Sequence, residues 1–251
     1  NGELSSDIAS LVSLTQIFLF GNNFSGEIPI EVWNLPNLTE FAIGGNEFTQ
    51  ELPPEIGNAV NLTWLDLGGN NIYGSIPEEF GNLVNLESLN FSADWESDYK
   101  LSGSLPSSIG NLVNLRGLYL SGHDLTGDIP TEIGSLDSLR GLSLSENSFY
   151  GEIPSSIGNL TNLTGLDLGG NQLSGEIPSE IGNLTNLIHL HVGNNENLSG
   201  QIPYWIGNLT NLEGLGLYNN QFTGEIITGF CDLTNLGFLA LWGNNLEGEI
   251  P

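Results

Sequence analysis

The chain has few basic residues, one cysteine, no methionine and no long apolar run, and these shortages exclude several classes of protein. Its three Lys and Arg residues are set against 30 acidic residues, which gives a formal net charge of −27. Nucleic acids and anionic membranes bind basic surfaces, so we expect neither as a partner. No stretch of about 18 apolar residues occurs, so we expect no direct membrane insertion.

The single cysteine, Cys231, excludes an internal disulfide. No signal peptide is visible and the first residue is not Met, so we interpret the chain as a mature or trimmed segment. Hydrophobic residues make up 39% of the chain and recur regularly, which argues against disorder.

One pattern, LxxLxxLxLxxNxLxGxIPxxIGN, repeats along the whole chain, and Leu160–Asn183 is a clear copy. Ten copies follow a partial copy in residues 1–10, and they begin at Leu11, Leu35, Ala59, Leu83, Leu112, Leu136, Leu160, Leu184, Leu209 and Leu233. The fourth copy has 29 residues and the eighth has 25, with the insertion of the fourth copy within residues 92–100. We therefore predict a single repeat domain over residues 1–251.

Each position of the pattern has a physical role. The LxL segment predicts a short strand with one buried face, stacked in parallel on its neighbours. The Asn that follows has an amide that can donate and accept in the turn, which predicts a ladder of Asn22, Asn46, Asn70, Asn147, Asn171, Asn220 and Asn244. Gly and Pro in GxIP predict a sharp corner, and PxxIGN leaves room for one short helical turn. Cys231 replaces the Gly of IGN, and we predict a buried, inert thiol, with a reactive thiol as the alternative.

The stretch Leu173–Leu187 reads LxGxIPxxIGNLxxL, which resembles the plant-specific class of leucine-rich repeats. The resemblance covers essentially the whole chain. It implies an α/β repeat fold: a curved, right-handed solenoid with a concave parallel sheet, short 3-10 or helical turns on the convex side, and a second short strand near SGEIP. Relatives include ectodomains of plant receptor-like kinases and receptor-like proteins, and polygalacturonase inhibitors. Such relatives imply an extracellular recognition surface and no enzymatic activity; their usual cysteine-paired caps are absent here.

Residues flanking the LxL leucines are expected to face out of the concave sheet. Aromatic residues at these positions gather towards the two ends of the chain: Phe18, Phe20, Trp64, Tyr218, Phe238 and Trp242. Exposed aromatic residues often mark recognition surfaces, so we predict that Trp64, Tyr218 and Trp242 contact a partner. Shielding of the ends of the core is the alternative.

The cations predict a second binding region, because Lys100, Arg116 and Arg140 all fall in the fourth to sixth copies. Arg116 and Arg140 hold the same position in consecutive copies, about 5 Å apart. Internal salt bridges are one interpretation of this pair, and a site for a carboxylate or sulfate of a partner is the other.

Small residues surround Tyr119 beside this pair, and the insertion adds Trp95 and Tyr99. His123 replaces a ladder Asn in the fifth copy, which predicts an interrupted ladder there. We predict that Trp95, Tyr99, Lys100, Arg116, Tyr119, His123 and Arg140 form a binding region, since insertions in repeat proteins often lie on the binding rim.

Three further groups carry weaker predictions. His189, His191 and Asp167 are weak candidates for a zinc site, since two imidazoles and a carboxylate suit that metal. The position that precedes IP in the pattern is acidic in seven copies and in the partial copy, where solvated surface is expected and calcium bridging is the alternative: Glu3, Glu27, Glu51, Asp128, Glu152, Glu176, Glu225 and Glu249. Among the N-x-S/T sequons we predict glycosylation at Asn23, Asn37, Asn61, Asn162 and Asn197.

These observations favour an extracellular or cell-surface binding module for a protein, peptide or carbohydrate, with no cofactor and no catalytic motif. The alternative is a structural subunit that stacks end to end into a filament or surface layer. Ice binding is disfavoured, because the exposed strand positions lack the regular array that it requires.

Overall fold

The alternating LxL segments form one continuous parallel sheet, the first sheet, in a computed structural model that describes residues 2–93 and 97–250. Each strand pairs with the strand of the next repeat at equivalent positions, for example Leu118 with Leu142. Its ten strands are β1 (Gln16–Phe18), β3 (Glu40–Ala42), β5 (Trp64–Asp66), β7 (Ser88–Asn90), β9 (Gly117–Tyr119), β11 (Gly141–Ser143), β13 (Gly165–Asp167), β15 (His189–His191), β17 (Gly214–Gly216) and β19 (Phe238–Ala240).

The xLxGxIP segments form a second parallel sheet of ten strands, which confirms the strand implied near SGEIP. These strands are β2 (Ser25–Gly26), β4 (Glu47–Glu51), β6 (Asn71–Ser75), β8 (Leu101–Ser104), β10 (Asp124–Gly127), β12 (Ser148–Glu152), β14 (Gln172–Gly175), β16 (Asn197–Gln201), β18 (Gln221–Glu225) and β20 (Asn245–Glu247). All of these strands except β4 and β20 contain a glycine with a positive φ, such as 77° at Gly175, which bends the chain towards the following corner.

The PxxIGN segments form single 3-10 turns, and Pro supplies the extended residue before most of them. In all but the first and last of these turns the residue at the Ile position is buried, and in most of them the residue after it is buried too. The turns are η1 (Ser6–Ser10), η2 (Ile30–Asn34), η3 (Pro54–Asn58), η4 (Glu78–Asn82), η5 (Ser107–Asn111), η6 (Thr131–Ser135), η7 (Ser155–Asn159), η8 (Ser179–Asn183), η9 (Tyr204–Asn208) and η10 (Thr228–Asp232).

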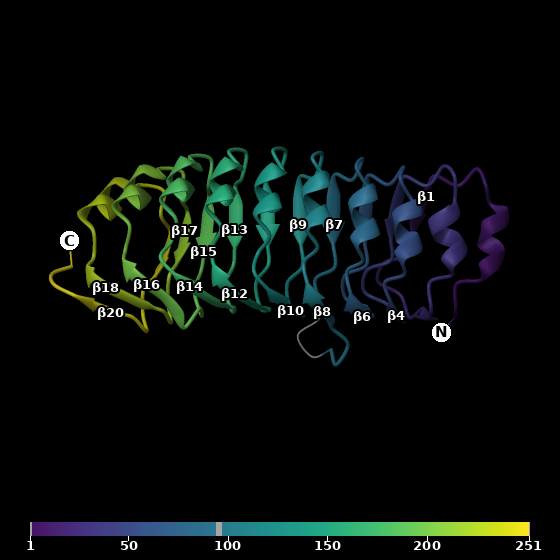
Figure 1. Ribbon diagram of the computed structural model, residues 1–251, viewed down its shortest axis with the longest axis horizontal. Helices are drawn as coiled ribbons and strands as arrows, with labels where there is room; N and C mark the ends of the chain where they lie inside the picture. The colour runs from purple at the N-terminus through teal and green to yellow at the C-terminus, as the bar shows by residue number, and fades with distance from the viewer. Residues whose placement is uncertain (1, 94–96, 251) are drawn as a thin grey trace.

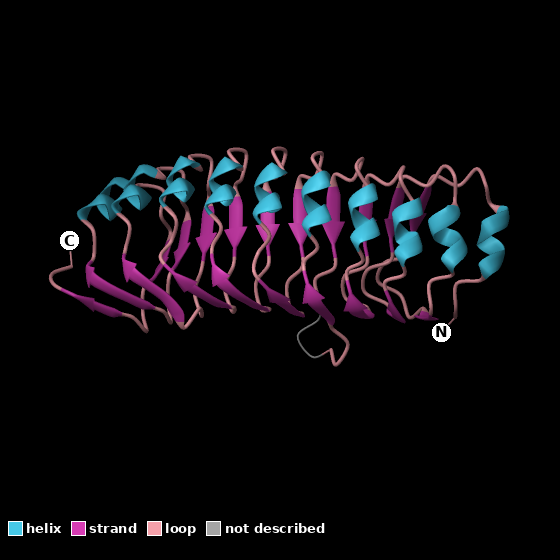
Figure 2. Ribbon diagram, in the orientation of Figure 1, coloured by secondary structure: helices cyan, strands magenta, loops and turns pink. Residues whose placement is uncertain are grey.

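The repeats stack into a curved, right-handed leucine-rich-repeat solenoid (Figure 1). Figure 2 shows its three sides: the turns lie in front, the first sheet lies behind them, and the second sheet runs along the lower edge. Residues 97–100 of the insertion in the fourth repeat lie beyond that lower edge, next to β8 (Figure 1). Among the described residues, none of the helical segments has the length and apolarity needed to cross a membrane.

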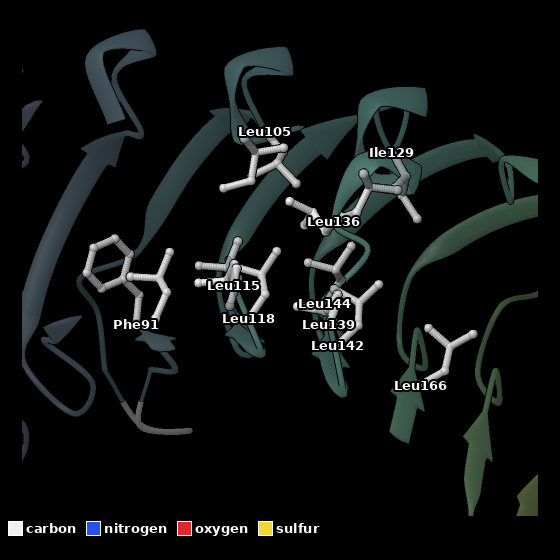
Figure 3. Packing of buried hydrophobic residues seen from close by; sticks show 14 of the residues in the cluster. Phe91, Leu105, Leu115, Leu118, Ile129, Leu136, Leu139, Leu142, Leu144 and Leu166 are labelled. Atoms are coloured by element: carbon white, nitrogen blue, oxygen red, sulfur yellow. The ribbon is translucent and has the colours of Figure 1, made fainter. Parts of the chain in front are cut away.

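The core is a column of leucine and isoleucine side chains that repeats from one coil to the next. Leu115, Leu118 and Leu120 of the fifth repeat are fully buried. Figure 3 shows Leu139 and Leu142 of the sixth repeat beside Leu115 and Leu118. Burying one such side chain stabilises the fold by about 1.5–3 kcal/mol. A single repeat has no second layer to cover its leucines, so the stack as a whole is the stable unit.

The predicted Asn ladder is present, and it links each repeat to the one before it. Asn147 donates from Nδ2 to the carbonyl oxygens of Leu120 and Leu144 at 2.8 and 3.1 Å, and its Oδ1 accepts from the Leu125 N–H at 3.1 Å. Asn195, fully buried, also belongs to the ladder, although the 25-residue spacing of its repeat hid it from the pattern.

The expected interruption of the ladder at His123 is wrong. The His123 ring is only 5% exposed, and Nδ1 accepts from the Leu101 N–H at 3.2 Å. Nε2 lies 2.6 Å from the Phe91 carbonyl oxygen, which can only accept, so Nε2 carries the proton. The imidazole therefore donates and accepts as the Asn amide does in other repeats, and it links the fifth repeat to the long fourth repeat. Because the ring is buried, His123 is not a surface group that a partner can reach.

The prediction of a buried thiol is also wrong, because Cys231 is exposed. It lies in η10, which contains no buried residue. At earlier turns the matching Gly packs beneath the next turn, whereas no further turn follows η10 in the described part of the chain.

Candidate functional site

The middle of the first sheet carries an aromatic ring laid over two glycines. A Cβ atom built on Gly117 would lie 2.8 Å from Tyr119 Cε2, and one on Gly141 would meet the Tyr119 hydroxyl at 2.5 Å. Since real Cβ atoms do not approach this closely, glycine on β9 and β11 is what allows the Tyr119 ring to lie across both strands. The ring is 40% exposed and presents a flat aromatic surface.

Beside Tyr119 the first sheet is hollowed over β11, β13 and β15. This floor hollow has a volume of about 400 Å³, and its charged and aromatic lining comes from Tyr119, Arg140, Asp167, His189 and His191. A second hollow of about 500 Å³, the rim hollow, continues from Arg140 along the rim of the first sheet where its strands begin. Arg140 and Thr164 line both hollows, so the two are adjacent.

The three cations have different environments. Arg116 forms an ion pair with Glu87, with Nη1 and Oε2 3.1 Å apart, and Lys100 lies 3.8 Å from Asp124. These are the two ion pairs between described residues, and Arg140 takes part in neither. Arg116 and Lys100 are thus each paired with an acid of the protein itself. Arg140 is exposed, lines both hollows and has no ion-pair partner among the described residues.

The structure divides the predicted central region into two. The Tyr99 ring lies against Tyr73 of β6, with centroids 6.0 Å apart, and Lys100 pairs with Asp124 of β10. Both therefore lie on the second sheet, whereas Tyr119, Arg116 and Arg140 belong to the first sheet and its rim. Trp95 lies outside the described residues. The repeat spacing placed the insertion after β7 but did not indicate which sheet it would cover.

The aromatic residues predicted near the ends form two groups on the first sheet. Trp64 packs on Phe18 at 5.7 Å, and Trp242 stacks on Tyr218 at 4.9 Å with an interplanar angle of 14°. Trp64 is 38% exposed and Trp242 61%. Their contact with a partner stays a prediction.

His189, His191 and Asp167 do not form a metal site. The ring of His191 leans over Gly216 towards Phe238, with ring centroids 5.9 Å apart, and Asp167 Oδ1 accepts from the Gly169 N–H at 3.1 Å. Within residues 2–93 and 97–250, no group of three His, Cys, Asp or Glu side chains is placed to hold a metal ion.

Sequence reasoning missed a second row of amides, the rim ladder. Each of these exposed Asn side chains donates from Nδ2 to a carbonyl of the previous repeat at 2.8–3.0 Å: Asn37, Asn61, Asn85, Asn114, Asn162, Asn186, Asn211 and Asn235. The signal was visible as the second Asn of NLTNLT, which the sequon pattern obscured. Glycosylation of Asn37, Asn61 and Asn162 in this ladder, and of the exposed Asn23 and Asn197, stays a prediction.

The acidic row lies along the exposed face of the second sheet. The side chain of Glu152 lies over Gly175 of the next strand, where a Cβ would meet Glu152 Cγ at 3.1 Å, and Glu176 covers Gly200 in the same way. This contact fixes consecutive carboxylates about 5 Å apart, the spacing of neighbouring strands. Like charges at that distance repel one another.

We expect salt to stabilise the protein for this reason. Screening of the acidic row and of the −27 net charge should raise the unfolding temperature by about 5 °C between low salt and ~1 M NaCl. Calorimetry at several NaCl concentrations measures this gain. A Glu152→Gln/Glu176→Gln variant should gain less, and an unfolding temperature that does not change with salt would contradict the expectation.

Comparison with known proteins identifies the repeat. A family model described as a leucine-rich repeat region matches residues 130–249, and a leucine-rich repeat model matches residues 13–35, 61–83 and 114–136. The comparison with curated proteins gave no match.

Among solved structures, the chain resembles the Arabidopsis receptor kinase HAESA, in complex with the peptide hormone IDA and the co-receptor SERK1. The TM-score is 0.92 and the identity 40%, over 100% of this chain and 41% of that chain. The plant peptide hormone receptor RGFR1, in complex with RGF2, gives a TM-score of 0.82 and 33% identity, over 98% and 42% of the two chains.

A plant ice-binding protein gives a TM-score of 0.77 and 27% identity, over 95% of this chain and 74% of that chain. The chain spans less than half the length of the two receptor chains. The family models match most of the chain and the structural neighbours are plant receptors, so this chain belongs to the leucine-rich repeat family.

Proposed function

We propose that this chain is a non-catalytic, extracellular recognition module that binds a peptide across its first sheet. The observation that carries the proposal is the hollowed centre of that sheet, which both Tyr119 and Arg140 line and where the Tyr119 ring lies flat over Gly117 and Gly141. An aromatic platform beside an exposed cation suits the mixed apolar and anionic character of a peptide. Two of the similar structures are plant receptors named with a peptide hormone, which supports the same class of ligand.

The test begins by panning a phage-displayed library of random peptides on the protein. Affinities of the selected peptides are then measured by fluorescence anisotropy for wild type, Tyr119→Ala and Arg140→Ala. Each substitution should weaken binding about tenfold or more, because aromatic and Arg side chains dominate most interfaces. The matched control is Tyr150→Ala, a 50% exposed tyrosine of β12 on the second sheet, which should leave affinity unchanged.

Trp95→Ala belongs to the same series, because the insertion was predicted to border the binding region. We propose that Trp95 adds to the ligand contact, and an unchanged affinity would remove the insertion from the binding region. Equal losses in the Tyr150→Ala control and in Tyr119→Ala would contradict a ligand site on the first sheet.

Two other functions fit the fold less well. Leu239 is a leucine of the repeat pattern that is 45% exposed on β19, and an end-to-end filament would bury it. Filaments seen by light scattering at micromolar concentration would favour that structural function over the binding module. Ice binding needs a regular array, and the neighbouring outward-facing positions of the first sheet, Tyr119, Ser143, Asp167 and His191, are chemically unrelated.

A further inference from the structure

The rim hollow begins at a cation and ends at an acid. Arg140, Thr164, Ile188 and Glu213 hold equivalent positions in four consecutive repeats. Backbone hydrogen bonds connect them in order: Thr164 N–H to Arg140 O at 2.8 Å, Ile188 N–H to Thr164 O at 2.7 Å, and Glu213 N–H to Ile188 O at 2.8 Å. All four side chains line the hollow of about 500 Å³.

Neither charge at the ends of the rim hollow is neutralised within the described part of the chain. The cation one repeat earlier, Arg116, is paired with Glu87, but neither Arg140 nor Glu213 takes part in an ion pair of the described residues. Both side chains are exposed, and the two residues between them are uncharged. A ligand that crosses this rim therefore meets a positive end and a negative end with a neutral middle.

The remaining lining offers acceptors to a peptide backbone. Asn162, Asn186 and Asn211 of the rim ladder line the same hollow, and each uses Nδ2 to donate to a carbonyl of the preceding repeat. Their Oδ1 atoms point to no donor among the described hydrogen bonds, so they remain able to accept from a bound N–H group.

We propose that the rim hollow binds an extended peptide segment that carries an acidic side chain at Arg140 and a basic side chain at Glu213. Three repeat steps of about 4.8 Å separate the two positions, roughly 14 Å in total. An extended chain covers that distance in about four residues, at ~3.3 Å per residue. Side chains separated by an even number of residues lie on the same face of an extended chain, so both charges can face the rim at once.

This inference rests on the proposed peptide-binding function and adds a charge pattern to it. The test compares peptide pools selected by phage display on three proteins: wild type, the charge-swapped variant Arg140→Glu/Glu213→Arg, and the control Glu87→Arg/Arg116→Glu. The control exchanges the charges of the neighbouring ion pair, which does not line the rim hollow. Thermal unfolding confirms that each variant is folded.

The wild-type pool should be enriched in an acid and a base about four residues apart, in one order along the peptide. The charge-swapped variant should select the reverse order, and the control should select the wild-type order. Synthetic peptides of the two orders should differ about tenfold in affinity for wild type, because like charges face each other in the wrong order.

The outcomes separate this inference from the function on which it rests. Peptides enriched without the charge pattern, or with the same order on the swapped variant, would overturn the inference and leave peptide binding in place. A wild-type pool with no enriched peptides would overturn the proposed function. If the swapped variant does not fold, Arg140→Gln replaces it, and a pool that keeps its acid preference would overturn the inference.

Discussion

Replacing Gly134 with alanine should destabilise the protein by about 2–3 kcal/mol, the cost of adding a methyl group to a tightly packed site. The Cβ would lie 2.5 Å from the carbonyl oxygen of Ser156 and 2.6 Å from its Cβ, both on the next turn, η7. Neither atom belongs to a flexible side-chain end, so η6 and η7 must move apart. Urea unfolding followed by circular dichroism measures the loss.

The matched control is Gly165→Ala on β13, where a new Cβ would meet nothing within 4 Å. Its effect should stay within about 0.5 kcal/mol. In η2 the position of Gly134 is occupied by Trp33. The residue that follows this turn, Leu35, has a ψ of 117°, whereas Leu136, which follows η6, has a ψ of 60°. The backbone of η2 thus takes a different path. Equal losses at Gly134 and Gly165 would show that close approach of the turns is not the cause.

Replacing His123 with alanine should cost about 2–4 kcal/mol, because a buried N–H and a buried carbonyl would lose their partners together. These are the Leu101 N–H and the Phe91 carbonyl oxygen. His123→Asn supplies an amide in place of imidazole and should cost less than His123→Ala. A smaller loss for alanine than for asparagine would contradict a ladder function for His123. Chemical unfolding at pH 8, where imidazole is neutral, measures both variants.

The same residue predicts a pH dependence of stability. Burial lowers the pKa of His123 below its ordinary value of 6.5; the Phe91 carbonyl and Asp124 oppose this shift, and Lys100 adds to it. The unfolded chain therefore binds the proton more readily than the folded one. The contribution of His123 to stability is complete above pH 6.5 and falls as the pH drops through the window between 6.5 and the lower folded pKa. His123→Asn should lose this part of the pH dependence.

The strand positions could be predicted from the sequence because they depend on local alternation. Leu118 and Leu120 face inward and Tyr119 faces outward, as a period of two requires. The register between strands follows from the constant repeat length. It also survives the longer fourth repeat, since Leu89 still pairs with Leu118.

The arrangement of side chains on the first sheet depends on neighbours in other repeats, and one repeat does not contain that information. The Tyr119 ring reaches across to Gly141, and the His191 ring to Phe238 two strands away. The inserted residues have no repeat partner to fix their direction, so the sequence did not show that Tyr99 would lie against Tyr73. The function of His123 was missed because an Asn was the only expected ladder residue.

The two amide ladders have a common direction. Asn147 donates back to the Leu120 carbonyl, Asn162 to the Asp137 carbonyl and Asn186 to the Thr161 carbonyl, so in these contacts between repeats the Asn side chain belongs to the later repeat and the carbonyl to the earlier one. Each coil therefore receives its final polar contacts from residues synthesised after it. On a ribosome, a coil stays incomplete until its successor has emerged, and the solenoid closes one repeat behind the growing end of the chain.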